Sequence, residues 1–176
     1  MLEIVSQSEL PFQLTTLRDH CRVTDRNQDP ALQRAMDSAA LMVERWTNCF
    51  LRTTTVDAHF RGEPGPYRFE YGPIQSVTSV TDATNSTTVS TNSYELDKTA
   101  GWPQLRSINA TALLSRNAYT VRFVAGYTSV PKPLETCVFS LAATLFENRE
   151  SMTPSQMHQL SVSMGSILMN YRMGSM

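Results

Sequence analysis

The chain has 176 residues, of which 41% are hydrophobic and 18% charged, and its formal net charge at neutral pH is −1. At this length a single domain with a sizeable core is expected, and the near-zero charge excludes strong nonspecific attraction to nucleic acid or to an anionic membrane. Cys21, Cys49 and Cys137 are an odd number without a C-x-x-C pair, which disfavours a disulfide framework and a zinc site and favours a reducing cytoplasm.

Two helices are predicted in the N-terminal third. Leu10, Leu14, Leu17 and Cys21 recur at helical spacing, which predicts a short helix over about 11–21. Asp29 is a suitable N-cap for the next helix, because its side chain can accept a hydrogen bond from a free backbone N–H. Pro30 would then stand at the first helical position, where its missing N–H costs nothing. That long helix, over about 30–50, carries an apolar seam at alternating spacings of four and three, formed by Leu32, Met36, Ala39, Val43, Trp46 and Phe50.

Residues 53–127 change to a β-rich pattern. Apolar and polar residues alternate over 56–60 and 67–71, and Glu63-Pro64-Gly65-Pro66 separates the two runs, so a hairpin with a long loop is predicted. Residues 74–93 are rich in serine and threonine and carry a single charge, Asp82, which indicates exposed or edge β-structure. A last strand is predicted over about 119–125, ending at Gly126.

Two further helices are predicted after the β-rich region. The helix over about 133–150 is apolar on almost every side and is therefore expected to be buried all round. Thr153-Pro154-Ser155-Gln156 has the pattern of a capping box and opens a helix over about 154–172, with Gly174 beyond its end.

The predicted fold class is α+β, in one domain over 1–176. A short N-terminal helix, a long helix and two C-terminal helices form a bundle, and the β-rich region is an insertion between them. The side chains predicted to form the bundle core are Leu32, Met36, Ala39, Val43, Trp46, Val138, Leu141 and Leu145.

Patterns of catalytic, cofactor-binding and metal-binding residues are missing from the sequence. His20, His59 and His158 lack metal-ligand spacing, and there is no Walker loop, G-x-S-x-G or G-x-G-x-x-G motif. Cys137 lies within an apolar helix, which favours a buried, inert thiol. No apolar run approaches the roughly 20 residues that span a bilayer, and no signal peptide is expected. We therefore expect a protein that is not an enzyme and binds no cofactor.

An arginine stripe is the one candidate for nucleic-acid binding. Arg18, Arg22 and Arg26 follow one another at four-residue intervals and could face phosphates. Acidic residues alternate with them, however, so a solvated face with ion pairs is the preferred interpretation. The acidic residues are Asp19, Asp25 and Asp29; they lack the glycine and the terminal glutamate of a calcium loop.

The C-terminal segment is rich in methionine, with six of the nine methionines after position 150. Methionine packs adaptably and recurs on surfaces that fit a partner. Met157 and Met164 fit an internal core equally well, whereas Met169, Met173 and Met176 fall off the helical stripe or beyond it. We expect this segment to dock into another protein through Met164, Ile167, Leu168, Met169, Tyr171, Arg172 and Met173.

A further set of segments is informative through its order along the chain. The segments are residues 14–23, Ala39-Ala40 running into residues 43–47, residues 72–81, 94–97 and 101–103, Val121 to Tyr127 with Val130-Pro131, Phe146 to Glu150, and Tyr171-Arg172. In this order they resemble the head–tail connector, or adaptor, proteins of tailed phages and gene transfer agents. Asn48 stands where the family often has glycine, and asparagine tolerates the left-handed conformation; Asn170 stands where the family often has proline.

The resemblance implies a structural virion protein of the neck, between head and tail, assembled in the host cytoplasm. Its subunits would form a homo-oligomeric ring, dodecameric to match the portal protein, that extends the DNA channel and presents a platform for stopper or tail-completion proteins. The C-terminal segment would dock on the portal, genomic DNA would pass without sequence-specific binding, and no membrane would take part. The alternative is a DNA-packaging subunit resembling a small terminase, which would need a basic helix-turn-helix near its N-terminus.

Overall fold

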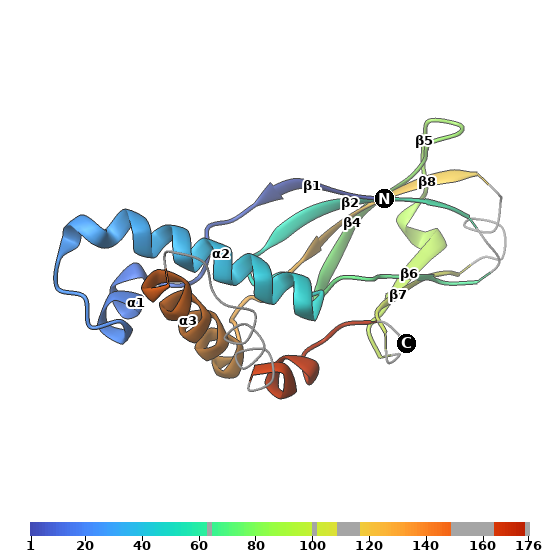
Figure 1. Cartoon of the computed structure of the whole chain (residues 1–176). Helices are drawn as coiled ribbons and strands as arrows, with labels where there is room; N and C mark the ends of the chain where they lie inside the picture. Colours follow the sequence, from blue (N-terminus) through green and yellow to red (C-terminus); the bar gives the residue numbers. More distant parts are fainter. Residues whose placement is uncertain (63–64, 100–101, 109–116, 149–163, 175–176) are drawn as a thin grey trace. The chain divides into compact units, whose positions relative to one another are not determined.

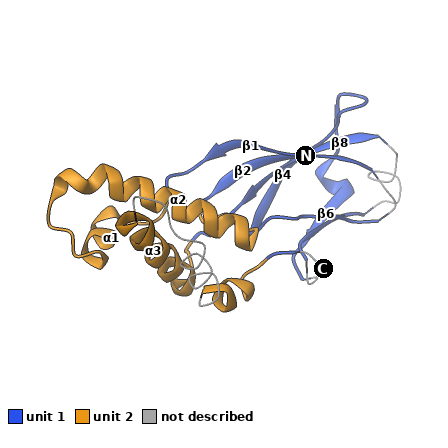
Figure 2. Ribbon diagram, viewed as in Figure 1, with its two compact units in different colours: residues 1–9, 52–128, 173–176 blue, residues 10–51, 129–172 orange. Residues whose placement is uncertain are grey.

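The computed structural model describes residues 1–62, 65–99, 102–108, 117–148 and 164–174. It has the predicted α+β class, with helices before and after the segment that supplies most strands of two antiparallel sheets. One strand, Leu2–Gln7, precedes all the helices and was not predicted. The chain divides into two compact units (Figure 2): a β-rich unit 1 of residues 1–9, 52–128 and 173–176, and a helical unit 2 of residues 10–51 and 129–172. The assignment of a single functional domain to the whole chain stays a prediction.

Unit 2 contains α1 (Leu14–His20), the 3-10 helix η1 (Arg26–Gln28), α2 (Asp29–Thr47) and α3 (Lys132–Glu147). Each helix is a few residues shorter than predicted. Of the last predicted helix, residues 154–163 lie outside the described part of the chain; residues 164–169 are helical and residues 170–171 form a turn.

The start of α2 differs from the prediction. Asp29 is the first residue of the helix and not its cap. Because η1 leads directly into α2, Gln28 occupies the N-cap position, and its side chain makes no capping hydrogen bond. Asp25 caps η1 instead, accepting a hydrogen bond from the backbone N–H of Asn27 at 3.0 Å. At the other end Asn48 closes α2 in the left-handed conformation, with φ 53°, as expected for asparagine.

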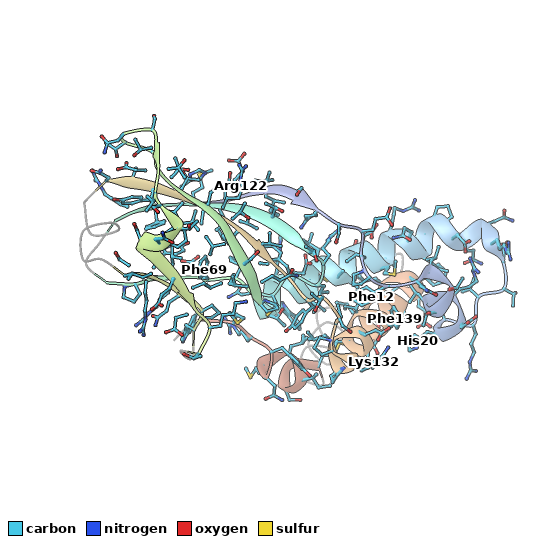
Figure 3. All side chains as sticks on the ribbon, turned by 180° about the vertical axis from the view of Figure 1, so that it is seen from behind. Phe12, His20, Phe69, Arg122, Lys132 and Phe139 are labelled. Carbon is cyan, nitrogen blue, oxygen red and sulfur yellow. The ribbon has the colours of Figure 1, made fainter. Side chains whose placement is uncertain are left out.

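The core of unit 2 is formed by α1, α2 and α3. Phe12 and Phe139 meet edge to face with ring centroids 5.7 Å apart, and His20 lies against the other side of this pair at 6.2 Å from Phe139 (Figure 3). The three helices also contribute apolar side chains with at most 2% of their surface exposed: Leu17, Leu32, Met36, Ala39, Val43, Leu134 and Val138.

Three residues predicted for the core are not fully buried. Trp46 is 49% exposed, and Leu141 and Leu145 are half-buried. A strict alternation of four and three drifts by about 20° per heptad around a straight helix, so the seam that begins at Leu32 has turned away two heptads later. The buried face of α2 continues through Ala40, Glu44 and Thr47, and α3 is buried on one face only.

Unit 1 holds two antiparallel sheets (Figure 1). The five-stranded sheet has the order β1-β2-β8-β4-β5, with β1 at Leu2–Gln7, β2 at Thr54–Arg61, β8 at Ala118–Ala125, β4 at Ile74–Asp82 and β5 at Thr87–Thr88. The three-stranded sheet has the order β3-β7-β6, with β3 at Tyr67–Arg68, β7 at Gln104–Ser107 and β6 at Tyr94–Asp97, which follows the 3-10 helix η2 at Thr91–Ser93.

The predicted hairpin between residues 56–60 and 67–71 is wrong. The first run belongs to β2, which pairs with β1 and β8, whereas Tyr67 pairs with Leu105 in the other sheet. Alternation identifies a strand but does not identify its partner, and β2 finds a longer apolar match in β8. The strand predicted at 119–125 is present as β8, at the centre of its sheet.

Aromatic side chains join the two sheets of unit 1. Phe69 follows β3 and meets Phe123 of β8 edge to face at 4.9 Å, and Tyr67 stacks on Phe60 of β2 at 4.2 Å. Both Phe69 and Phe123 are almost fully buried, as is Leu105 of β7. The core of this unit therefore lies between the inner faces of its two sheets.

Candidate interaction surfaces

The C-terminal segment predicted to dock on a partner is partly packed and partly exposed. Leu168 is buried, with 3% of its surface accessible, and Met164 and Tyr171 are half-buried. Ile167 is 37% exposed, Met169 is 72% exposed, and Arg172 is exposed as well. Of the predicted docking residues, Ile167, Met169 and Arg172 are thus directly available to a partner.

Contacts with Cys49 and with Gly72 help to hold the chain after residue 169. The Cys49 thiol donates a hydrogen bond to the carbonyl oxygen of Tyr171 at 3.2 Å. The Met173 side chain lies so close to Gly72 that a Cβ at Gly72 would come within 2.7 Å of its terminal methyl carbon. Met173 therefore packs against Gly72 within unit 1. The flexible methionine side chain suits this internal contact as well as it would suit a contact with a partner.

A second exposed apolar surface lies on α2 and was not anticipated from the sequence. Leu41, Met42 and Trp46 are 47%, 37% and 49% exposed. Leu41 and Met42 are neighbours in the chain, and exposed Arg45 and Trp46 follow each of them one helical turn later. We call these four residues the α2 stripe. Tryptophan, methionine and arginine are the side chains enriched at protein interfaces.

Of the α2 stripe, only Trp46 was predicted for the core, and the sequence contains a signal for the stripe at Leu41. Leu41 lies off the seam of alternating four and three, and a large apolar residue off the seam of an amphipathic helix indicates a second face. Trp46 completed the seam by spacing alone, and the structure turns it outward.

The arginine stripe near α1 is divided by an ion pair. Arg18 donates hydrogen bonds from Nε and Nη2 to the two carboxylate oxygens of Asp29, the first at 3.0 Å. The two side chains are only 18% and 26% exposed. Arg22 follows α1 at φ 54°, so the helical spacing does not continue past it. The continuous row of phosphate-facing arginines is therefore not formed in this structure.

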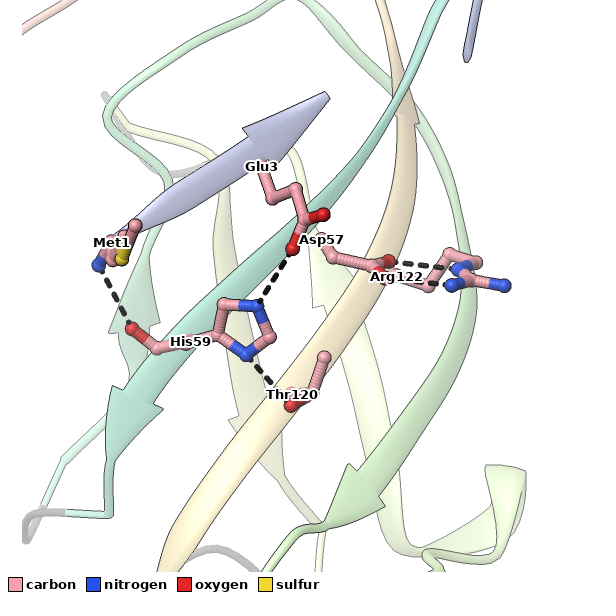
Figure 4. A network of polar contacts seen from close by, with 6 residues as sticks. All are labelled: Met1, Glu3, Asp57, His59, Thr120 and Arg122. Carbon is pink, nitrogen blue, oxygen red and sulfur yellow. Dashed lines mark hydrogen bonds and ion pairs between the residues drawn. The ribbon is translucent and has the colours of Figure 1, made fainter. Parts of the chain in front are cut away.

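The outer face of the five-stranded sheet carries a polar network (Figure 4). Arg122 of β8 donates to both carboxylate oxygens of Asp57 on β2, at 2.7 and 2.6 Å. His59 lies beside them, with Nδ1 2.9 Å from the Thr120 hydroxyl and Nε2 3.7 Å from the Glu3 carboxylate. The hydrogen bonds from Arg122 lower the pKa of Asp57. Each ionisable group here has a partner on a neighbouring strand, so the network joins β1, β2 and β8.

Within the described residues, no cluster of His, Cys, Asp and Glu could hold a metal ion, and no helix is long and apolar enough to cross a membrane. Cys137 is buried in α3 and desolvation raises its pKa, so its thiol is a poor nucleophile.

No protein-family profile and no curated protein matches the chain. Its fold, however, matches solved structures over the full length. A chain in the virion of a native gene transfer agent particle has a TM-score of 0.76 at 20% identity, covering 100% of this chain and 97% of that chain. A chain in the neck of an empty gene transfer agent particle, computed with C6 symmetry, gives 0.78 at 19% with the same coverage. A chain in the neck of the native particle, computed with C12 symmetry, gives 0.71 at 20%, again over 100% and 97%. At these identities the likeness establishes a shared fold.

Proposed function

We propose that the chain is a structural subunit of the neck of a phage-like particle and acts there as the head–tail adaptor. The observation that carries this proposal is the match of the whole fold, helices and both sheets together, to chains of gene transfer agent virions and necks. The match extends over 100% of this chain and 97% of the other, so the proposal does not depend on one local segment.

In this role the chain forms a ring beneath the portal, dodecameric to match it, that extends the DNA channel. The neck structures with C6 and C12 symmetry support a cyclic arrangement. A ring built from identical subunits needs two different surfaces on each copy, because every interface is formed head to tail. The face of the ring that points away from the portal is the platform for stopper or tail-completion proteins.

The C-terminal segment is the proposed docking element for the portal. Ile167, Met169 and Arg172 are the exposed members of the set that also contains Met164, Leu168, Tyr171 and Met173. An arginine beside flexible apolar side chains is a common composition at interfaces. In the proposed complex the exposed members make the first contacts, and the half-buried members become buried against the portal.

Passage of DNA through the ring fits the charge of the chain. The net charge is −1, and Arg18 is neutralised by Asp29. A net charge near zero means weak overall attraction to the phosphates of DNA, which lets DNA slide. The same ion pair argues against the alternative role of a DNA-binding packaging subunit.

The test is to mix the purified chain with the portal protein of the same particle and with linear phage DNA in separate experiments. Co-migration with the portal on size exclusion, and no DNA gel shift at physiological salt, support the adaptor role. A salt-sensitive DNA shift without portal binding would favour the packaging subunit instead.

A further inference from the structure

The five-stranded sheet has an open edge at each end. At one end β1 pairs with β2 on one side, and the described residues place no strand on its other side. At the other end β5 pairs only with Thr81 and Asp82 of β4, so residues 74–79 of β4 have no strand partner there among the described residues. The two open stretches are equally long: β1 spans the six residues Leu2–Gln7, and residues 74–79 of β4 are also six.

The backbone of β1 presents hydrogen-bonding groups outward. The nitrogen of Met1 donates to the carbonyl of His59 at 3.1 Å, and His59 N–H donates to the carbonyl of Met1 at 2.9 Å. In an antiparallel ladder such bonded pairs alternate with unbonded ones, so the N–H and C=O groups of Leu2 and Ile4 point to the open edge. β1 contains neither lysine nor proline, which commonly block an edge against pairing.

At β1 the apolar face of the five-stranded sheet is no longer buried. Ile4 lies opposite Val56, and opposite residues project to the same face. Val56 is fully buried in the core, yet Ile4 is 53% exposed and Val5, at the bulge, is 46% exposed. A neighbouring strand with apolar residues on that face would bury Ile4.

The open stretch of β4 provides such residues. Ile74 and Val77 lie opposite Ala125 and Phe123, which are buried, so they project to the core face. On the other face Ser76 is exposed. The carbonyl of Gln75 points outward, where Lys98 Nζ donates to it at 2.6 Å. Lys98 is exposed, so its side chain can turn away when a neighbouring strand donates to this carbonyl instead. The β4 edge therefore has an apolar face and a polar face, like the β1 edge.

We propose that β1 of one copy of this chain pairs antiparallel with residues 74–79 of β4 in the next copy, so that the sheet continues from subunit to subunit. The inference rests on the proposed function, since this pairing is a subunit contact of the proposed ring. β1, β2, β8 and β4 are successive antiparallel neighbours, so the two edges run in opposite directions. Identical copies in a cyclic array therefore present them antiparallel, with apolar faces aligned, and the contact is head to tail.

Pairing of β1 with β1 of a second copy is disfavoured by charge. If Leu2 and Ile4 supplied the bonds to each other's strand, the two Glu3 residues would stand directly opposite one another. Like charges at opposite positions of a ladder destabilise it. In the β1–β4 pairing Glu3 instead faces the neutral, hydroxyl-rich strand around Ser76.

Disulfide trapping tests the geometry. Glu3 and Ser76 are exposed on the outer face, so Glu3→Cys and Ser76→Cys leave the core intact; Cys21→Ser removes the half-exposed native thiol. Under mild oxidation of the assembled ring, the double variant is expected to give a ladder of covalent dimers, trimers and larger species. A mixture of the two single variants is expected to give dimers only, and either single variant alone only monomers.

A second variant tests the hydrogen bonds. Ile4→Pro removes an outward N–H without breaking the β1–β2 ladder, and Ile4→Val keeps the N–H and the apolar side chain. We expect Ile4→Pro to remain folded and to weaken self-association at least tenfold, with Ile4→Val near wild type. Dimers from Glu3→Cys alone would overturn the proposal in favour of β1–β1 pairing.

These experiments distinguish a failure of the strand pairing from a failure of the adaptor role. Rings on the portal that yield no disulfide between positions 3 and 76, and that persist in Ile4→Pro, would overturn the strand pairing and leave the adaptor role intact. A chain that stays monomeric at high concentration and on the portal would contradict both.

Discussion

The guanidinium of Arg122 on β8 and the carboxylate of Asp57 on β2 form a two-point ion pair between directly opposite residues of the five-stranded sheet. Bidentate geometry makes this one of the stronger polar contacts a protein surface can offer. It lies on the outer face, beside His59 and Glu3, and so helps to hold together the strands that carry the β1 edge.

Acid should weaken the protein through this pair. The hydrogen bonds from Arg122 hold the pKa of Asp57 below its ordinary value. A carboxyl group of this kind stabilises the fold above its unfolded pKa of about 4, and that contribution is lost as the pH falls through the lower folded pKa. Asp57→Asn should therefore lose less stability than wild type between pH 5 and pH 2, measured as urea midpoints. Equal losses in the two proteins would contradict the assignment.

Gly126 should tolerate no side chain. Its φ is +112°, and an added Cβ would lie 2.0 Å from the carbonyl oxygen of Arg52. Gly126→Ala is expected to cost at least about 2 kcal/mol of unfolding free energy. Gly165→Ala is the matched control, because Gly165 is helical with open space around it. That change should stabilise by about 0.5–1 kcal/mol, and chemical denaturation measures both.

The burial of α2 predicts unequal costs for two large apolar residues. Leu32 is fully buried, so Leu32→Ala should cost about 2–5 kcal/mol. Trp46 is 49% exposed, so Trp46→Ala should cost less than about 1 kcal/mol in the isolated subunit. Thermal and urea melts of the two variants compare these costs. A larger loss for Trp46→Ala would return this residue to the core.

Met169 should matter for binding and not for folding. It is 72% exposed, so Met169→Glu should leave the melting temperature within a degree or two of wild type, as surface substitutions do. A charge in the proposed docking surface should weaken portal binding at least about tenfold, equivalent to about 1.4 kcal/mol. Thr16→Glu, exposed on α1, adds the same charge elsewhere and should bind normally. Unchanged binding by Met169→Glu would remove this residue from the docking surface.

The parts of the fold that follow from local periodicity could be predicted from the sequence. The spacing of apolar residues predicts the long α2, the apolar α3 and the central β8. Asn48 ends α2 in the left-handed conformation, which asparagine tolerates. Strand partners could not be predicted, because alternation at Val56 and Ala58 is equally compatible with any apolar neighbour. The pairing with β8 is decided by the whole sheet.

The candidate surfaces could be predicted only in part. Exposure of Met169 agrees with its place off the helical stripe, but the burial of Leu168 and the contact of Met173 with Gly72 depend on the folded path of the tail. β1 was missed altogether, because apolar and polar residues alternate only over Leu2, Glu3 and Ile4 before the bulge at Val5, which is too short a run to indicate a strand. Trp46 was placed in the core by spacing, although the drift of a straight helix turns it outward.

Electron microscopy of the purified chain mixed with its portal is the most direct test of the adaptor assignment. We expect a ring of twelve copies stacked coaxially on the narrow end of the portal, with residues 164–173 against the portal and a continuous central channel. A portal without added density, under conditions in which the chain is folded and in excess, would contradict the assignment.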